Sequence, residues 1–162
     1  MTAIRRAETG EAEAVARVIN NAFRPAEEFF VEGDRITVDG VRDLFAKGVF
    51  LVAGDYDGVV YVELRGERAY FGLLSVDPAR QGGGIGSAMV AGAEEYASAH
   101  GCRHMDIRVV NLRSELPPRY RKLGYVLTGT EPWPEGTPSK VACHFLCMEK
   151  PLAPASTSPS DT

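Results

Sequence analysis

The apolar positions of the chain change period several times, which predicts helices that alternate with strands. After Thr9, a residue type that caps helices, apolar side chains recur at helical spacing as far as Phe23. The helical period returns three times further on, and a glycine follows each of these later stretches. Helices are therefore expected over residues 9–23, 37–48, 85–100 and 112–123, the last interrupted early by Pro117 and Pro118. Residues 24–36 break the period and are expected to form a loop or a short helical turn.

Short apolar runs between these helices predict strands. They cover residues 3–7, 49–53, 59–64, 69–76, 105–110, 125–130 and 141–148. The brief turns at 55–58 and 65–67 require antiparallel neighbours, because parallel strands need a long crossover connection. From residue 151 the chain is dominated by Pro, Ala, Ser and Thr. The sequence thus predicts one domain over residues 1–150 and a disordered tail over 151–162.

The most informative stretch is the glycine-rich sequence that precedes the helix expected at 85–100. Glycines at positions 82, 83, 84 and 86 leave the backbone without Cβ atoms where that helix begins. The first amides of a helix lack internal partners and lie at the positive end of its dipole, so they can bind a phosphate. The sequence therefore predicts a phosphorylated ligand at this loop.

Two well-known phosphate loops fit this stretch poorly. The P-loop pattern requires a lysine after the last glycine, and none is present. The dinucleotide pattern G-x-G-x-x-G/A places Ser87 or Met89 at its final position, although Asp106 lies where a ribose-binding acid is expected. A doubly wound nucleotide-binding domain therefore stays open as a weaker alternative, because the two hairpin turns argue against an all-parallel sheet.

The loop instead contains Gln81-x-x-Gly84-x-Gly86, preceded by Val76-x-Pro78. This pattern resembles the coenzyme A loop of the GNAT (Gcn5-related N-acetyltransferase) superfamily. A second stretch, from residue 111 to 125, resembles the later motif of the same family, an Asn followed by Tyr-x-Lys-x-Gly-aromatic. Its Asn-to-Tyr gap is longer than the commonest family spacing, and it contains the proline pair.

The resemblance covers residues 3–150 and implies an α/β (α+β) GNAT fold. Such a fold has a mixed, largely antiparallel sheet of about seven strands with about four helices, and the sheet is splayed between its fourth and fifth strands. The implied activity moves an acetyl group from acetyl-CoA to a primary amine by direct attack in a ternary complex. The acceptor would be a small molecule or a peptide amine, and no metal is expected. A non-catalytic module that senses acyl-CoA is the alternative within the same fold.

Candidate site residues follow from the resemblance and, for Glu63, from the position of a carboxylate within a predicted strand. Tyr120 lies where the family places the acid that protonates the departing thiolate, and a phenol suits that role. Glu63 is the carboxylate inside the central strand of the 59–76 hairpin and is the candidate base. Tyr70 occupies the position where some members carry a catalytic glutamate, and other members rely on ordered water. The residues expected to bind the coenzyme are Leu74, Val76, Gln81, Gly82, Gly83, Gly84, Gly86, Ser87 and Asn111.

Other side chains are candidates for the periphery of the site. Phosphate contacts are open to the basic side chains nearby, which are Arg80, Arg119 and Lys122. The acceptor pocket would be shaped by aromatic residues, namely Phe29, Phe30 and Trp133, and by Arg35, which could pair with an acidic group.

Composition narrows the possible partners. The formal net charge of −4 argues against a general nucleic-acid or membrane-surface role, which requires concentrated positive charge. No apolar run approaches the roughly 20 residues of a membrane span, and a cytoplasmic protein is expected. The three cysteines are not spaced as metal ligands, so buried free thiols are expected. Either a monomer or a homodimer is compatible with the sequence.

Overall fold

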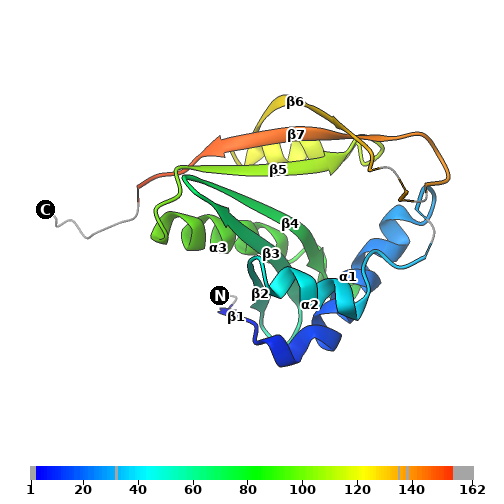
Figure 1. The fold of residues 1–162 in the computed structure, drawn as a ribbon, viewed down its shortest axis with the longest axis horizontal. Helices are drawn as coiled ribbons and strands as arrows, with labels where there is room; N and C mark the ends of the chain where they lie inside the picture. Colours follow the sequence, from blue (N-terminus) through cyan, green and yellow to red (C-terminus); the bar gives the residue numbers. More distant parts are fainter. Residues whose placement is uncertain (1–2, 32, 135, 138, 155–162) are drawn as a thin grey trace, which may run out of the picture.

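The computed structural model describes residues 3–31, 33–134, 136–137 and 139–154 (Figure 1). Its centre is a seven-stranded mixed sheet in the order β1-β2-β3-β4-β5-β7-β6. The strands are β1 (Ile4–Arg6), β2 (Val49–Ala53), β3 (Gly58–Arg65), β4 (Arg68–Val76), β5 (His104–Val110), β6 (Val126–Pro132) and β7 (His144–Pro151). The helices are α1 (Ala12–Glu27), α2 (Val38–Phe45), α3 (Ile85–Ala99) and α4 (Leu116–Lys122), with 3-10 turns η1 (Thr9–Glu11) and η2 (Pro78–Arg80). The predicted mixed sheet with four helices is confirmed.

The sheet consists of two parts that meet along one short parallel ladder. Strands β4 and β5 pair over Arg68–Tyr70 and His104–Asp106, and every other neighbouring pair of described strands is antiparallel. Beyond this ladder β4 continues to Val76 and β5 to Val110, and the two strands diverge (Figure 1). The expected splay between the fourth and fifth strands is therefore present.

A β-bulge in β4 accompanies the divergence. Tyr61 of β3 is opposite Gly72 and Val59 is opposite Ser75, so one residue of β3 faces two residues of β4. One of those two, Leu73, has φ of 55°, a left-handed conformation that is unusual for a side chain of this type. Because a bulge bends its strand and increases the local twist, it directs the end of β4 away from β5.

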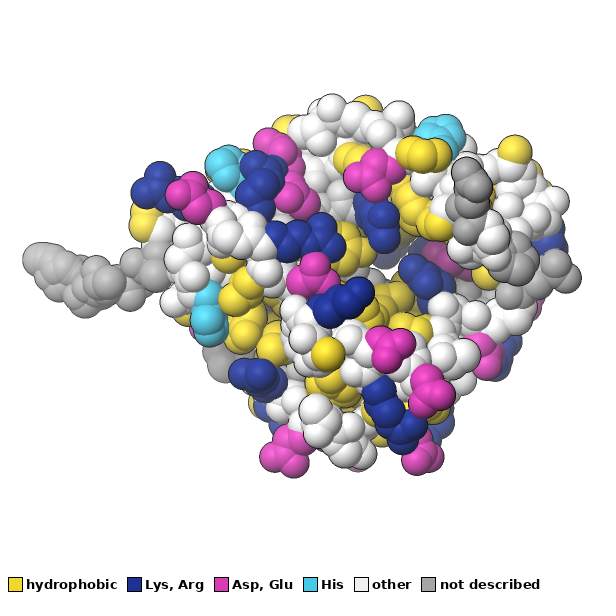
Figure 2. Space-filling model, viewed as in Figure 1, with side chains coloured by type: hydrophobic (Ala, Val, Ile, Leu, Met, Phe, Trp, Pro, Cys, Tyr) yellow, Lys and Arg dark blue, Asp and Glu magenta, His cyan; other side chains and the backbone are white. Residues whose placement is uncertain are grey.

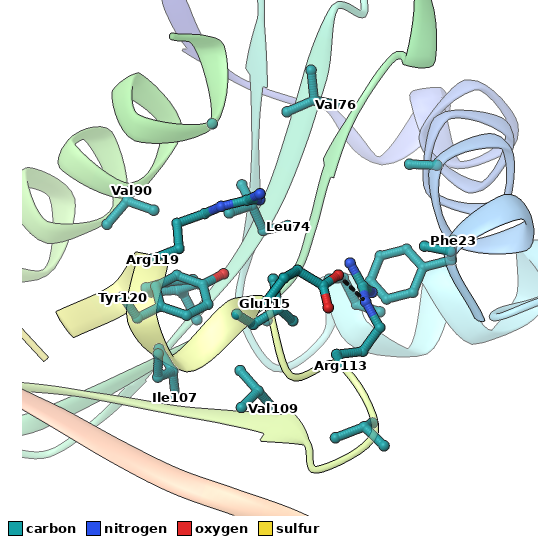
Figure 3. A pocket seen from close by; sticks show the side chains of 18 of the residues that line it. Phe23, Leu74, Val76, Val90, Ile107, Val109, Arg113, Glu115, Arg119 and Tyr120 are labelled. Atoms are coloured by element: carbon teal, nitrogen blue, oxygen red, sulfur yellow. Dashed lines mark hydrogen bonds and ion pairs between the residues drawn. The ribbon is translucent and has the colours of Figure 1, made fainter. Parts of the chain in front are cut away.

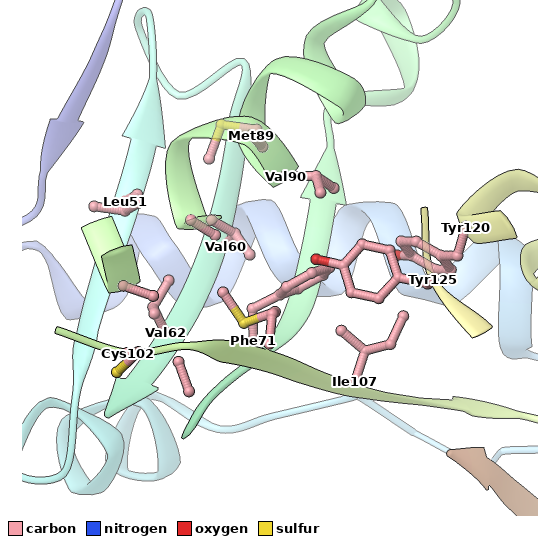
Figure 4. Packing of buried hydrophobic residues seen from close by; sticks show 14 of the residues in the cluster. Leu51, Val60, Val62, Phe71, Met89, Val90, Cys102, Ile107, Tyr120 and Tyr125 are labelled. Carbon is pink, nitrogen blue, oxygen red and sulfur yellow. The ribbon is translucent and has the colours of Figure 1, made fainter. Parts of the chain in front are cut away.

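Helices cover both faces of the first part of the sheet and create two cores. Successive residues of β2 point to opposite faces: Val49 and Leu51 join the core under α3, whereas Phe50 joins the core under α1 and α2. Every residue of β2 is buried, which explains its continuous apolar sequence. Figure 4 shows the α3 core, where Met89 packs above the strands and Phe71 lies toward the second part of the sheet. Each large side chain buried in this way contributes about 1.5–3 kcal/mol.

The two parts of the sheet are also connected through α3. Glu94 on this helix accepts a hydrogen bond from the Tyr125 hydroxyl at 2.7 Å and from Lys150 Nζ at 2.9 Å. Tyr125 precedes β6 and Lys150 lies in β7, so both belong to the second part. The Tyr125 ring meets Phe71 of β4 edge-on, with centroids 6.1 Å apart. This contact and the Glu94 hydrogen bonds join the two parts beyond the end of their ladder.

The wide end of the opening is closed by the segment after α1. Phe30 is fully buried against Val110 and Phe145, and Trp133 from the β6–β7 connection packs on the same cluster. Lys140 of that connection donates its backbone amide to the Phe30 carbonyl at 2.6 Å. In Figure 1 the end of α1 correspondingly meets the connection that leads into β7.

Two expected helix boundaries were wrong. Helix α1 does not end near residue 23 but continues through Pro25 to Glu27, because a proline in the last turn removes only one internal hydrogen bond. Helix α4 begins at Leu116 rather than at residue 112. Pro117 and Pro118 form its first turn instead of interrupting it, since the amides of a first turn have no internal acceptor.

The last strand and the residue after it extend slightly past residue 150, where the domain is expected to end. Strand β7 begins at His144, three residues later than predicted, and extends to Pro151. Leu152 packs against the α3 core and donates its amide to the Arg103 carbonyl at 2.7 Å. Residues 155–162 of the expected tail lie outside the described residues.

Two further observations concern the whole described chain. None of its described helices combines the length and the apolar character that crossing a membrane requires. All three cysteines are free thiols, of which Cys102 is buried and Cys143 and Cys147 are partly exposed.

The hydrogen bond from Tyr125 to Glu94 can be tested by removing a single hydroxyl. Tyr125→Phe keeps the buried ring but loses this bond, and we expect the free energy of unfolding to fall by about 1–2 kcal/mol. Tyr96→Phe, on the same helix as Glu94, is the control and should change it by less than about 0.5 kcal/mol. Urea unfolding measures both. Equal losses in the two variants would show that the bond does not connect the two parts of the sheet.

Candidate active site

The divergence of β4 and β5 opens a cavity of about 680 Å³ (Figure 3). Its walls come from β4 and β5, from the start of α3, from α4, and from the end of α1 with the segment that follows it. The edge of β4 beyond the ladder faces this space without a strand beside it. Backbone amides and carbonyls at such an edge can bind an extended ligand in the manner of an added strand.

A glycine cradle forms one end of the cavity. Gly82 and Gly84 have φ of 90° and 82°, and a Cβ atom at either position would meet nothing within 4 Å. The first internal bond of α3 runs from the Ala88 amide to the Gly84 carbonyl at 3.0 Å. The amides of residues 85–87 therefore precede the internal ladder and are available to an anion.

Most residues expected to bind the coenzyme line this cavity. Those in the lining are Leu74, Val76, Gln81, Gly82, Gly84, Gly86 and Ser87. Gln81 also donates its side-chain amide to the Val76 carbonyl at 3.3 Å, which connects the loop to the end of β4. Gly83 and Asn111 do not line the cavity. Asn111 accepts a hydrogen bond from the His144 amide at 2.8 Å and thereby connects the end of β5 to the start of β7.

Tyr120 lies on α4 and points its hydroxyl into the cavity beside Leu74 (Figure 3). Its ring packs against Phe71 and Tyr125, and only 6% of the residue is exposed. Burial raises the pKa of the phenol to about 12, although the nearby Arg119 and Arg113 oppose the shift. The hydroxyl therefore holds its proton throughout the neutral range and is available as a donor.

The structure does not place Glu63 in the cavity. Its carboxylate accepts hydrogen bonds from the Tyr61 hydroxyl and from Arg65 Nε, both at 2.6 Å. Burial acts to raise the pKa of Glu63, but these two hydrogen bonds outweigh it and hold the pKa below its ordinary value. A carboxylate in this setting is a weak proton acceptor. Tyr70, opposite Glu63 on β4, does line the cavity.

A buried ion pair that the sequence did not indicate lines the opposite wall. Arg113 Nη1 lies 3.0 Å from Glu27 Oε2, and Arg113 Nε lies 2.8 Å from Glu115 Oε2. Glu27 is only 6% exposed, and burial raises its pKa despite the two arginines, Arg113 and Arg35, that lower it. One feature of the sequence could have indicated the position of Glu27. It follows Phe23 by four residues, so the two side chains lie on the same face of α1.

The peripheral candidates divide between the cavity and the surface. Arg35, Arg119 and Trp133 line the cavity. Phe30 supports the wall from behind, and Phe29 is 54% exposed. Outside the cavity lining are Arg80, which pairs with Asp57 at 3.5 Å, and Lys122.

Comparison with known families places the chain among acetyltransferases. Residues 46–127, half of the chain, match the family described as acetyltransferase (GNAT) domain. The chain belongs to this family and is an acyltransferase of the GNAT type. A search of curated proteins finds no match.

Solved structures agree in fold. Nourseothricin acetyltransferase is 24% identical, with a TM-score of 0.71 over 94% of this chain and 99% of that one. The Escherichia coli ribosomal-protein-S18-alanine N-acetyltransferase is 14% identical, with a TM-score of 0.73 over 98% of both chains. A Salmonella typhimurium protein solved with its cofactor acetyl-CoA is 16% identical, with a TM-score of 0.72 over 98% of both chains.

The glycine cradle can be tested as the phosphate site of acetyl-CoA. Ligand at 100 times its dissociation constant should raise the free energy of unfolding by about 2.7 kcal/mol. In Gly84→Val the new side chain occupies the open space before α3, so this stabilisation should be lost. Thermal melts with and without acetyl-CoA measure the effect.

Gly66→Val is the matched control, because Gly66 also has positive φ and open space around it but lies in the β3–β4 turn. Both variants should lose similar stability without ligand, since a β-branched residue is strained at positive φ. If acetyl-CoA stabilised both variants equally, the cradle would not be the phosphate site.

Proposed function

We propose that the protein is an N-acetyltransferase that moves an acetyl group from acetyl-CoA to a primary amine by direct attack, with both substrates bound. One observation carries the proposal: a single cavity contains an anion cradle at a helix N-terminus, an unpaired strand edge and a buried phenol. These three features match the three parts of the reaction, namely the phosphates of the coenzyme, its extended arm and its leaving thiolate.

In this assignment the coenzyme lies along the opened edge of β4. Its pyrophosphate binds the amides at the start of α3, where Gln81, Gly82, Gly84, Gly86 and Ser87 form the cradle, with Gly83 completing the loop. Its pantetheine arm runs beside Leu74 and Val76, and the Val76 amide polarises the thioester carbonyl as an oxyanion-type donor. Asn111 would contribute from the end of β5, using the part of its side chain that does not bind His144.

The reaction then proceeds by one acyl transfer. The neutral amine attacks the thioester carbonyl carbon, and the carbon–sulfur bond breaks. Tyr120 gives its proton to the departing thiolate, and the proton that the acetylated nitrogen releases returns through water to the phenolate. A free alkylammonium must first lose a proton, which costs roughly 4–5 kcal/mol at pH 7 for a pKa near 10.4. We do not assign this step to Glu63, because that carboxylate lies outside the cavity and is already hydrogen-bonded to Arg65. Ordered water is the proposed proton acceptor.

The activity is tested by measuring thiol release from acetyl-CoA with a panel of primary amines. Amine-dependent release, with the acetylated amine identified by mass spectrometry, is the expected result. Binding of acetyl-CoA without release for any amine would contradict the proposal and favour a sensor of acyl-CoA.

Tyr120→Phe tests the proposed acid. The ring packing stays while the hydroxyl is lost, so coenzyme affinity should hold within a few-fold while kcat falls about 10²-fold. Because a thiol of pKa near 8.5 leaves unassisted as thiolate at high pH, the defect should shrink from about pH 6 to 9. Tyr61→Phe, whose hydroxyl binds Glu63 outside the cavity, is the control and should retain kcat. Full activity of the Tyr120 variant at every pH would make Tyr120 a core residue only.

A further inference from the structure

The cavity walls carry more positive than negative charge, although the chain as a whole is acidic. Its lining includes four arginines, Arg35, Arg108, Arg113 and Arg119, against two carboxylates, Glu27 and Glu115, whereas the chain has a net charge of −4. Figure 2 shows the hollow on this face with Lys or Arg side chains on both sides and hydrophobic atoms deeper. The four arginines differ in what occupies their donors, and this difference indicates what the cavity can bind.

Arg113 is already neutralised. It lies between Glu27 and Glu115, at 3.0 Å and 2.8 Å, and its side chain is largely buried. Arg119 lies on α4 and extends between Leu74 and Val90, on the side of the cavity where α3 begins (Figure 3). At that position Arg119 can contact the coenzyme rather than the acceptor. Arg35 and Arg108 are therefore the two arginines that can bind the acceptor.

Both remaining arginines pack on aromatic rings, and among the described residues neither forms a short ion pair, although Arg35 lies near enough to Glu27 to lower the pKa of that carboxyl. Arg35 Cζ lies 5.6 Å from the centre of the Phe23 ring, and Arg108 Cζ lies 4.6 Å from that of Phe145 and 5.8 Å from that of Tyr70. Stacking uses the flat face of a guanidinium and leaves its N–H edge open to a ligand. Arg108 has a long contact, 3.3 Å, with the exposed Glu131, and an exposed pair of this kind contributes little. The Tyr70 hydroxyl is a second polar neighbour and helps to raise the pKa of Arg108.

The backbone beside Arg35 is fixed by a side chain of α1. Asn20 donates to the Ile36 carbonyl at 2.8 Å and accepts from the Ile36 amide at 3.0 Å. Arg24 forms an ion pair with Asp34 on the other side of Arg35. The segment that carries Arg35 is therefore held against α1 at both neighbours of this residue, and its guanidinium is positioned in advance of binding.

We infer that the acceptor is a small primary amine that carries a carboxylate or phosphonate group, bound by Arg35 and Arg108. This inference rests on the proposed function and names its substrate class. Guanidinium groups bind carboxylates and phosphate-type oxyanions with two parallel hydrogen bonds, so the acidic group fixes the orientation of the acceptor. The cavity must also hold the acyl end of the coenzyme, which leaves room for a small molecule.

The same charges assist the reaction. A positive environment disfavours the ammonium form and lowers the pKa of the bound amine. The neutral nucleophile then forms more readily, and no dedicated protein base is needed. A plain alkylammonium has no group to offset the two arginines, so it is expected to bind poorly.

The test compares three forms of each acceptor: a standard L-amino acid, its α-amide and the amine that lacks the carboxylate. Aminoalkyl phosphonates form a second acidic series. Acetyl transfer should have a kcat/KM at least tenfold higher for the best acid than for its amide and its plain amine. In Arg35→Gln and Arg108→Gln, KM for the acid should rise about tenfold while the amide is unaffected. Arg42→Gln, an arginine of α2 paired with Asp39, is the control and should match the wild-type protein.

Two outcomes separate this inference from the proposed function. The inference would be wrong if neutral amines and acids were acetylated with equal kcat/KM, and if neither arginine variant changed that ratio. The proposed acetyl transfer would still be supported. If no amine were acetylated, thermal melts of the protein with CoA would show whether acids bind. Binding of acids that is lost in Arg108→Gln would keep the anion site and refute the transferase. Absence of both transfer and binding would overturn the inference.

Discussion

The early end of the ladder between β4 and β5 is the constraint on which the other features of the molecule depend. Parallel pairing stops at Tyr70 and Asp106, although both strands continue. Backbone groups that leave a ladder need other partners when they are buried, so this edge has to face water or a ligand. The bulge at Leu73 turns the end of β4 away, and the resulting space is the cavity that contains the glycine cradle and Tyr120.

A sheet that opens in this way must be held together elsewhere. Glu94 on α3 connects the first part to Tyr125 and Lys150 on the second, and the Phe30 cluster closes the wide end. These contacts fix the distance across the cavity without restoring the ladder. The strands and helices that line the site are thus joined on both sides of the cavity, which positions the backbone of β4 relative to the phenol of α4.

Much of this arrangement could be predicted from local hydrophobic patterns and from the glycine-rich motif. Strand β2 was placed correctly because its apolar run is continuous, and the glycine loop was placed before α3 because its missing Cβ atoms have a direct physical meaning. The helix ends were less predictable, since Pro25 usually breaks a helix and is tolerated here only in the last turn. The Glu27–Arg113 pair could not be predicted, because its members are far apart in sequence and meet only when α1 closes over the cavity. The surroundings of Glu63, by contrast, are local in sequence, because Tyr61 and Arg65 are its second neighbours on β3 and lie on the same face of the strand.

Amide hydrogen exchange with and without acetyl-CoA tests the central claim most directly, because it reports on the opened edge itself. If the coenzyme takes the place of the missing strand, protection should increase at residues 73–76 and at the first turn of α3. The β1–β2 ladder, on the far edge of the sheet, should exchange at unchanged rates. Protection that appeared equally across the sheet, or that left residues 73–76 unaffected, would contradict the account.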